Sequence, residues 1–282
     1  MVLKDDDLSW YVKGLLRKYN IRPKKSLGQT FTISKSLLLE MTNYAEVGAE
    51  DTVLEVGAGL GCLTRVLAEK AKKVLAVEVD RRLVKVLRNE LGAYKNIEII
   101  EGDFLEMEGL KADKVVSTIP YSIASPLTFK LLKDVDFKLA VLVYQKEFAE
   151  RLVAKPGTRS YGRLTVAVSL SAEVKIIRYV PRFMFYPIPD VDSAMVLIKP
   201  KEYRIKNYEE FLRFIRILFS QRNKILLGVL RRASGKGLIP DVNEELIPHD
   251  LAKKRVRELS LEELFTIYRA VHGSGRPKNR GL

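Results

Sequence analysis

The chain has 282 residues and a formal net charge of +14, from 49 lysines and arginines against 35 aspartates and glutamates. This length fits one large domain, or a large domain and a smaller one, and the basic excess favours a polyanionic partner. One cysteine excludes an internal disulfide framework, two histidines offer no zinc-ligand spacing, and no apolar stretch reaches the ~20 residues of a membrane helix. We therefore expect a monomer of the cytoplasm that binds no metal and enters no membrane.

The sequence begins with a basic N-terminal extension, residues 1–33. Amphipathic spacing predicts a short helix over residues 8–19, and a basic loop interrupted by a glycine follows over residues 22–32. Neither feature indicates a function by itself.

A strand, a glycine-rich turn and a helix follow. Residues 52–56 are apolar and β-rich, Gly57, Gly59 and Gly61 alternate with other residues, and helical spacing begins at Cys62. Glycines suit a turn that brings the backbone close to a ligand at the carboxyl end of a parallel strand, although an ordinary turn between strand and helix is the alternative. A dinucleotide fingerprint requires glycine where Cys62 stands, so the pattern disfavours plain NAD binding.

Carboxylates stand at the ends of three successive predicted strands. Glu55 lies at the end of the first, Glu78 ends the strand over residues 73–78, and Asp103 follows the strand over residues 97–101. Because the carboxyl ends of parallel strands meet at one edge of a sheet, we expect the three acids to share that edge. Glu78 can accept hydrogen bonds from both hydroxyls of a ribose, and Asp103 can accept from an adenine amine. A loop cap is the alternative for Asp103 alone, but the order of the three favours an adenosine-containing ligand.

Strands and helices continue to alternate up to residue 200. The predicted helices are 62–70, 81–91, 124–133, 144–152 and 161–170, and the predicted strands are 114–117, 138–143, 174–179 and 194–199. This order is typical of an α/β fold with a doubly wound, Rossmann-like parallel sheet, which the last two strands close as an antiparallel pair. We therefore expect one domain over residues 1–200.

The pattern changes to helices alone after Lys201. We predict helices over residues 208–219, 222–232 and from Ser260 onward, where Ser260 and Glu263 form a capping box. A glycine-containing basic tail ends the chain and is expected to be disordered when free. Residues 201–282 therefore form a small all-helical C-terminal domain with a flexible basic tail.

Two aromatic segments complete the sheet edge. Thr118-Ile119-Pro120-Tyr121 follows the strand over residues 114–117, and an aromatic, proline-stiffened loop runs over residues 183–193. A hydrophobic plug under a loop is the alternative for the second segment. Beside an adenosine pocket, both segments favour an attached reaction site.

Together these segments resemble the class I S-adenosylmethionine-dependent methyltransferases, and more closely the KsgA family of small-subunit rRNA adenine dimethyltransferases. The resemblance runs from about Lys24 to the final helix. It is carried by a lysine pair before Leu27-Gly28-Gln29, by the segment 118–121, by the Phe-x-Pro-x-Pro-x-Val-x-Ser segment that begins at Phe185, and by residues 220–224 and 254–260.

The resemblance implies a role for each matching residue. The cofactor would be S-adenosyl-L-methionine, with residues 1–33 covering it. Its binding residues would be Gln29, Thr30, Thr32, Glu55, Gly57, Gly59, Gly61, Glu78, Asp103 and Thr118. The family has other residues where Thr30 and Thr32 stand.

The catalytic residues implied by the resemblance are Thr118, Ile119, Pro120, Tyr121 and Phe185. The side chain of residue 118 and the Ile119 carbonyl would accept hydrogen bonds from the target amine, and the rings of Tyr121 and Phe185 would hold the base. The family has asparagine where Thr118 stands. Because a hydroxyl is the weaker acceptor, we expect slower or differently staged methylation.

Residues 211–236 contain seven basic side chains and no acidic one. A solvated helix face is the alternative, but beside an adenosine site this run favours RNA. The expected phosphate contacts are Lys24, Lys25, Arg222, Lys224, Arg231 and Arg232.

The leading hypothesis is an rRNA adenine N6-dimethyltransferase that acts on adjacent adenosines near the 3′ end of small-subunit rRNA, within the rRNA or the pre-ribosomal small subunit. The alternative is a ribosome-assembly or nucleic-acid-binding factor that keeps the methyltransferase fold with reduced or lost catalysis. A DNA adenine methyltransferase is a third and weaker interpretation.

Overall fold

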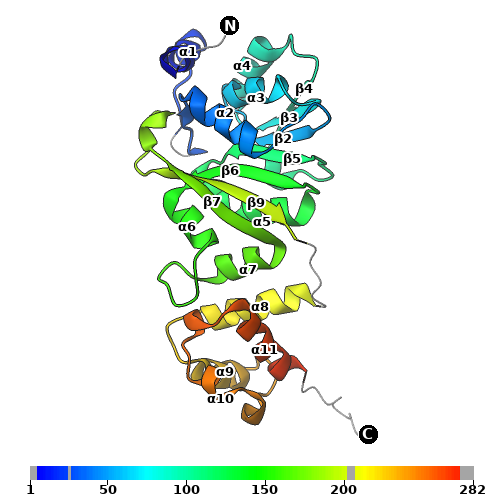
Figure 1. The fold of residues 1–282 in the computed structure, drawn as a ribbon, viewed down its shortest axis with the longest axis vertical. Helices are drawn as coiled ribbons and strands as arrows, with labels where there is room; N and C mark the ends of the chain where they lie inside the picture. The colour runs from blue at the N-terminus through cyan, green and yellow to red at the C-terminus, as the bar shows by residue number, and fades with distance from the viewer. Residues whose placement is uncertain (1–4, 25–26, 202–206, 274–282) are drawn as a thin grey trace. The chain divides into compact units, whose positions relative to one another are not determined.

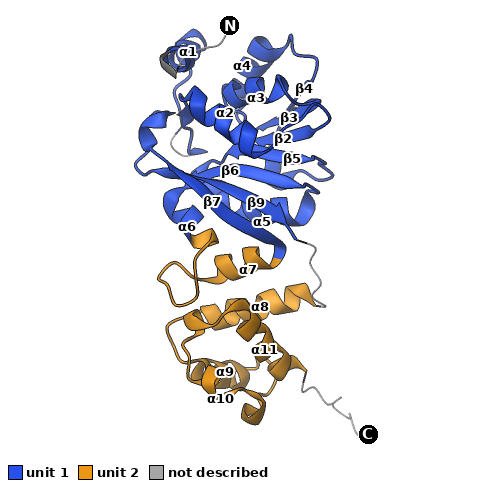
Figure 2. Ribbon diagram, in the orientation of Figure 1, with its two compact units in different colours: residues 1–150, 171–201 blue, residues 151–170, 202–282 orange. Residues whose placement is uncertain are grey.

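The computed structural model describes residues 5–24, 27–201 and 207–273. These form two compact units, residues 1–150 with 171–201 and residues 151–170 with 202–282 (Figure 2). The sequence places one boundary at residue 200, whereas the structure assigns residues 151–170 to the second unit, because Tyr161 and Val166 are buried in its core. The predicted basic tail from residue 274 and the predicted phosphate contact Lys25 lie outside the described residues.

The first unit is built on a seven-stranded sheet of order β4-β3-β2-β5-β6-β9-β7 (Figure 1). The neighbouring strands β4, β3, β2, β5 and β6 are parallel, and β9 runs antiparallel between β6 and β7. This confirms the predicted doubly wound sheet closed by an antiparallel pair. The order reverses between β2 and β5, which is where such sheets bind ligands. The strands are β2 Thr52–Val56, β3 Lys73–Glu78, β4 Ile97–Glu101, β5 Lys114–Thr118, β6 Leu139–Gln145, β7 Ala172–Val180 and β9 Ser193–Pro200.

Helices follow the strands as the periodicity predicts, except that Tyr144 and Gln145, predicted to open a helix, end β6 instead. The helix predicted over residues 81–91 is α4, and Asp80 caps it by accepting a hydrogen bond from the Arg82 backbone. The helices of this part of the chain are α1 Asp5–Lys18, α2 Lys35–Tyr44, α3 Cys62–Ala68, α4 Arg81–Leu91, α5 Ala124–Asp134 and α6 Lys146–Leu152.

Two elements near the N-terminus are absent from the predicted set. The first is α2, which Ser34 caps by accepting a hydrogen bond from the Leu37 backbone. A serine before a helical apolar pattern is a local signal for a helix start, so the sequence does contain the information for this helix. Strand β1 Phe31–Thr32 pairs antiparallel with β8 Phe185–Tyr186. This ladder joins segments far apart in the sequence, which periodicity cannot predict.

The second unit is helical, as predicted. Its core contains Phe211, Phe214 and Ile267. The helix predicted from residue 222 is wrong at its start, because the Lys224 backbone donates to the Gln221 carbonyl at 2.8 Å and closes a turn before α9. Its helices are α7 Arg163–Ser171, α8 Tyr208–Phe219, α9 Leu226–Gly235, α10 His249–Ala252 and α11 Leu261–His272. The last residue of α7, Ser171, is assigned to the first unit.

The capping box predicted before α11 is confirmed. The Glu263 backbone donates to Ser260 Oγ at 3.2 Å, and the Ser260 backbone donates to Glu263 Oε2 at 2.8 Å. Within the described ranges, none of the helices has the length and apolar character needed to span a bilayer.

Candidate active site

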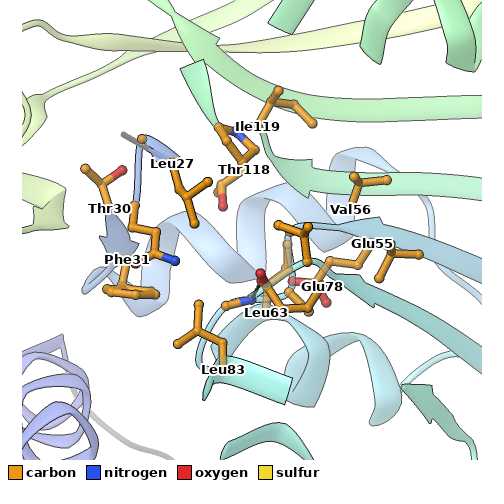
Figure 3. A pocket seen from close by; sticks show the side chains of 18 of the residues that line it. Leu27, Thr30, Phe31, Glu55, Val56, Leu63, Glu78, Leu83, Thr118 and Ile119 are labelled. Carbon is orange, nitrogen blue, oxygen red and sulfur yellow. Dashed lines mark hydrogen bonds between the residues drawn. The ribbon is translucent and has the colours of Figure 1, made fainter. Parts of the chain in front are cut away.

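A pocket of about 190 Å³ opens at the carboxyl ends of β2, β3 and β5. The glycine turn, the strand-end acids, the 118–123 loop and the N-terminal segment line it, and Figure 3 shows Glu55, Glu78 and Thr118 among these lining residues. Every residue that the sequence predicts for cofactor binding or catalysis lines this pocket except Gly61. The structure therefore brings the two predicted sites into one cavity.

Gly61 has a packing role instead. Its φ is +78°, and an added Cβ would lie 2.7 Å from Leu91 Cδ1 and 2.9 Å from Leu87 Cδ2, both on α4. A side chain there would displace α4 from the start of α3. Glycine at this position is needed for helix packing, and the sequence pattern alone cannot separate this reason from ligand approach.

Glu78 fixes the glycine turn. Its Oε2 accepts from the Gly59 backbone at 2.8 Å, and its Oε1 accepts from the Asp80 backbone at 2.9 Å. Burial raises the pKa of Glu78, and these backbone hydrogen bonds oppose that rise. A carboxylate oxygen can accept a second hydrogen bond, so Glu78 can hold the turn and still receive a ligand hydroxyl.

Glu55 is buried beside the pocket with an unused acceptor. Only 3 % of the residue is exposed, and its Oε2 has no hydrogen-bond partner among the described residues. Burial raises the pKa of Glu55 to about 8, an effect that the Thr64 hydroxyl reduces and Glu78 increases. Thr32 Oγ1, also on the pocket wall, is likewise buried without a described partner. Unpaired buried oxygens are rare in folded proteins, and a ligand with N–H or O–H groups would satisfy them.

Gln29 fastens the N-terminal segment to the pocket edge. Its Nε2 donates to Asp80 Oδ2 at 2.9 Å, and its Oε1 accepts from the Lys24 backbone at 2.8 Å. Arg82 donates to the same Asp80 carboxylate and holds the pKa of Asp80 well below its usual range. Part of the hydrogen-bonding capacity of Gln29 is therefore used within the protein. Lys24 Nζ lies 3.9 Å from Asp80 Oδ2, so this predicted phosphate contact also faces an acid.

The loop after β5 carries two acceptors without partners in the described part of the chain. The Ile119 backbone donates to the Val143 carbonyl at 2.9 Å, which anchors the loop to β6. Among the described residues, no donor reaches the Thr118 hydroxyl or the Ile119 carbonyl. Pro120 packs against the glycine turn, where a Cβ on Gly57 would lie 3.4 Å from its ring. The loop is thus anchored to β6 and to the glycine turn, and two of its oxygens, on residues that line the pocket, have no described partner.

Tyr121 has a partner that sequence reasoning missed. Its hydroxyl lies 2.8 Å from the Oγ of Ser193, which is fully buried at the start of β9 and lines the same pocket. Burial raises the pKa of Tyr121. Phe185 is 2 % exposed and stands opposite Thr32 in the β1–β8 pair. Ser193 ends the predicted 183–193 segment, and its place in that segment is the available signal.

Asp103 lines the pocket and also caps a short turn, since its Oδ1 accepts from the Leu105 backbone at 2.9 Å. One of its carboxylate oxygens therefore has a structural partner. Thr30 lines the pocket beside Leu27 in the N-terminal segment (Figure 3).

The predicted basic residues of the second unit differ in whether another protein group already occupies their charged end. Arg231 forms a bidentate ion pair with Glu244, at 2.5 and 2.6 Å. Arg222 donates to the Arg159 carbonyl at 2.6 Å, and Arg232 Nε donates to Gln221 Oε1 at 3.1 Å. Lys224 is exposed and forms no ion pair with a described carboxylate.

A second basic segment lies alongside Arg222 and Lys224. The Val256 backbone donates to the Lys224 carbonyl at 3.1 Å, and the Arg257 backbone donates to the Arg222 carbonyl at 3.0 Å. Arg255, which precedes them, is exposed. The basic run over residues 253–257 is visible in the sequence, but its pairing with residues 222–224 is not predictable from it.

Most of the chain is similar to proteins of one family. A family model described as ribosomal RNA adenine dimethylase matches residues 20–271. A protein of Methanosarcina mazei named probable ribosomal RNA small subunit methyltransferase A is 44 % identical over 260 residues, which cover 91 % of this chain and 95 % of that protein. A protein of the same name from Pyrococcus abyssi is 45 % identical over 258 residues, covering 90 % and 93 %.

Two solved structures share the fold. A dimethyladenosine transferase from Plasmodium falciparum superposes with a TM-score of 0.73 at 32 % identity, covering 84 % of this chain and 95 % of that one. The 23S rRNA methyltransferase ErmE superposes with a TM-score of 0.68 at 27 % identity, covering 86 % and 99 %. The chain belongs to the ribosomal RNA adenine dimethylase family, which confirms the predicted resemblance and makes the chain an rRNA adenine methyltransferase.

Proposed function

We propose that this protein transfers methyl groups from S-adenosylmethionine to the N6 amines of adjacent adenosines near the 3′ end of small-subunit rRNA. The observation that carries this proposal is one pocket lined both by the strand-end acids and by the 118–121 loop, whose two acceptors have no described partner. The names of the archaeal relatives support small-subunit rRNA as the substrate.

The pocket suits this cofactor. S-adenosylmethionine supplies a methyl group that its sulfonium has already activated. Glu78 would accept the ribose hydroxyls, Asp103 the adenine amine, and Glu55 and Thr32 offer buried oxygens that lack partners among the described residues. The glycine turn lets the backbone approach the ligand without a clashing side chain.

The 118–121 loop would hold the target amine. Its nitrogen is a poor nucleophile because its lone pair is delocalised into the adenine ring. Acceptors at the Thr118 hydroxyl and the Ile119 carbonyl favour a pyramidal nitrogen and stabilise charge that builds there. Positioning is therefore the main catalytic contribution of the protein, and no strong base is required.

The rings of Tyr121 and Phe185 would receive an adenine taken out of its stack. Enzymes that act on a base inside folded RNA must expose it, and aromatic rings compensate for lost stacking. Ser193 and the β1–β8 pair fix these two rings in place.

The second unit would hold the RNA backbone, in part with residues that the sequence did not single out. Lys224 and Arg255 are exposed, and Arg222 and Arg257 lie next to them along the paired segments. Arg231 contributes less, because Glu244 neutralises it. In the first unit, Lys24 and Lys25 would add phosphate contacts, and these contacts position RNA without reading its sequence.

Mass spectrometry of nucleosides tests this function. Small-subunit particles that lack the modification are incubated with the protein and S-adenosylmethionine, and Tyr121→Ala serves as the matched inactive variant. Dimethyladenosine in the wild-type reaction alone supports the proposal. Monomethyladenosine alone would indicate that Thr118 prevents the second transfer. Tight particle binding with no methylated product would favour the assembly-factor alternative.

A further inference from the structure

Helix α1 lies outside the residues that the family model matches and is nevertheless firmly packed. Leu8, Val12, Leu15 and Leu16 are buried in the core of the first unit. On a flank of the helix, the hydroxyl of Tyr11 accepts from Arg65 at 2.7 Å. Whatever the remaining face of α1 binds would therefore be presented on a fixed support.

That remaining face exposes the only tryptophan of the chain. Trp10 is 74 % exposed, and Lys13 and Arg17 follow at helical spacing on the same side. We call these three residues the α1 outer face. Neither Lys13 nor Arg17 forms an ion pair with a carboxylate in the described part of the chain, whereas Lys18 is paired with Glu90 at 2.6 Å.

The α1 outer face contacts Tyr186, which neighbours two residues that line the pocket. Lys13 Nζ lies 5.2 Å from the centre of the Tyr186 ring. Tyr186 follows the pocket residue Phe185 and stands opposite Phe31, which also lines the pocket. In Figure 1, α1 is the dark blue helix beside the N-terminus. Because Trp10 and Arg17 share the face of Lys13, an RNA strand that left the pocket past Tyr186 would have all three residues within its path.

We propose that the α1 outer face binds unpaired RNA that flanks the target adenosine, with the Trp10 indole stacked on a base and Lys13 and Arg17 against phosphates. This rests on the proposed function. An exposed aromatic ring followed by two cations suits single-stranded RNA, since every base offers a face for stacking and every linkage a charge. Lys13 and Arg17 both follow Trp10 along the helix, so the phosphates of the bound strand would lie on the C-terminal side of the indole.

The fluorescence of the single tryptophan tests the contact directly. Wild-type protein is titrated with an rRNA fragment that carries the target adenosines, and binding is followed both by tryptophan emission and by the anisotropy of a label on the RNA. Emission quenched in parallel with the anisotropy supports the proposal. Anisotropy that reports binding while emission stays constant overturns this inference alone. No binding by either signal overturns the inference together with the proposed function.

Substitutions give a second, independent measurement. Trp10→Ala is expected to weaken RNA binding about tenfold, Trp10→Phe to retain most of the affinity, and Arg17→Gln to lower the salt slope by about one. Tyr44→Ala removes another exposed aromatic of the first unit and serves as the control. Equal affinities for Trp10→Ala and wild type overturn the proposal. So does a loss seen with whole particles but not with the protein-free fragment, because it assigns this face to a protein partner.

Discussion

The backbone N–H of Gly59 donates a hydrogen bond of 2.8 Å to Oε2 of Glu78. The residue proposed to receive the ribose thus also shapes the turn over which the cofactor would lie. Cofactor binding and the geometry of the glycine turn would therefore both depend on the Glu78 carboxylate.

Glu78→Gln should therefore weaken cofactor binding and the fold together. An amide keeps one acceptor and turns a donor toward a backbone N–H, so at least one buried hydrogen bond is lost at about 1–3 kcal/mol. Calorimetric titration with S-adenosylmethionine and thermal unfolding measure the two effects. Glu98→Gln, at an exposed ion pair on β4, is the control. Normal cofactor affinity in Glu78→Gln would contradict the assigned role.

Glu55 makes the stability of the free protein depend on pH. Its pKa rises from 4.5 to about 8 on folding, mainly through burial, so the folded state keeps a proton that the unfolded state releases. Stability should fall as pH rises between these values, by at most about 1.4 kcal/mol per unit. Urea unfolding across pH 5 to 8 measures this decline. Glu55→Gln, which cannot ionise, should remove this part of it, and identical profiles for the two proteins would refute the prediction.

Thr118→Asn should raise the rate of methyl transfer. An amide oxygen is the better acceptor for the target amine, and one good transition-state hydrogen bond corresponds to roughly tenfold to a hundredfold in rate. Thr118→Val, which removes the hydroxyl, should be slower than wild type. Single-turnover measurements with saturating RNA isolate this step. Equal rates for all three proteins would show that residue 118 does not contact the reacting amine.

Ser193→Ala should slow transfer by releasing the Tyr121 hydroxyl. Tyr121→Phe breaks the same 2.8 Å hydrogen bond from the other side, so the two changes should not add. The double-mutant cycle, measured as single-turnover rate and as RNA affinity, checks this coupling. Additive losses would mean that the two hydroxyls act separately.

In the second unit, Lys224→Ala should weaken RNA binding and reduce the salt slope by about one, because its ammonium has no described carboxylate partner. Arg231→Ala is the matched comparison, and its effect should be small because Glu244 already neutralises the guanidinium. Salt-dependent affinities for an rRNA fragment measure both. A larger loss for Arg231→Ala would show that the ion pair opens on binding.

Local signals predict most of the fold and the composition of the pocket. Helix α4 matches its predicted residues 81–91, since apolar periodicity and the Asp80 cap agree. Because parallel strands align their carboxyl ends, the sequence predicts that Glu55, Glu78 and Asp103 share one edge of the sheet, and all three line the pocket.

Contacts between distant segments could not be predicted. Nothing local connects Tyr121 with Ser193, or Phe31 with Tyr186, and their proximity depends on how the whole sheet is assembled. The same holds for Arg231, whose charge is cancelled by Glu244 across a loop. Such pairings decide which residues of a predicted site remain free to act.

The short β1–β8 ladder joins the two walls of the pocket. Thr32, on the side proposed for the cofactor, stands opposite Phe185, on the side proposed for the target base. A ligand that shifts one strand moves the other, so the affinities for cofactor and RNA would be thermodynamically linked, each changing the other by the same factor. The two residue pairs of this ladder would then carry the coupling between cofactor and RNA.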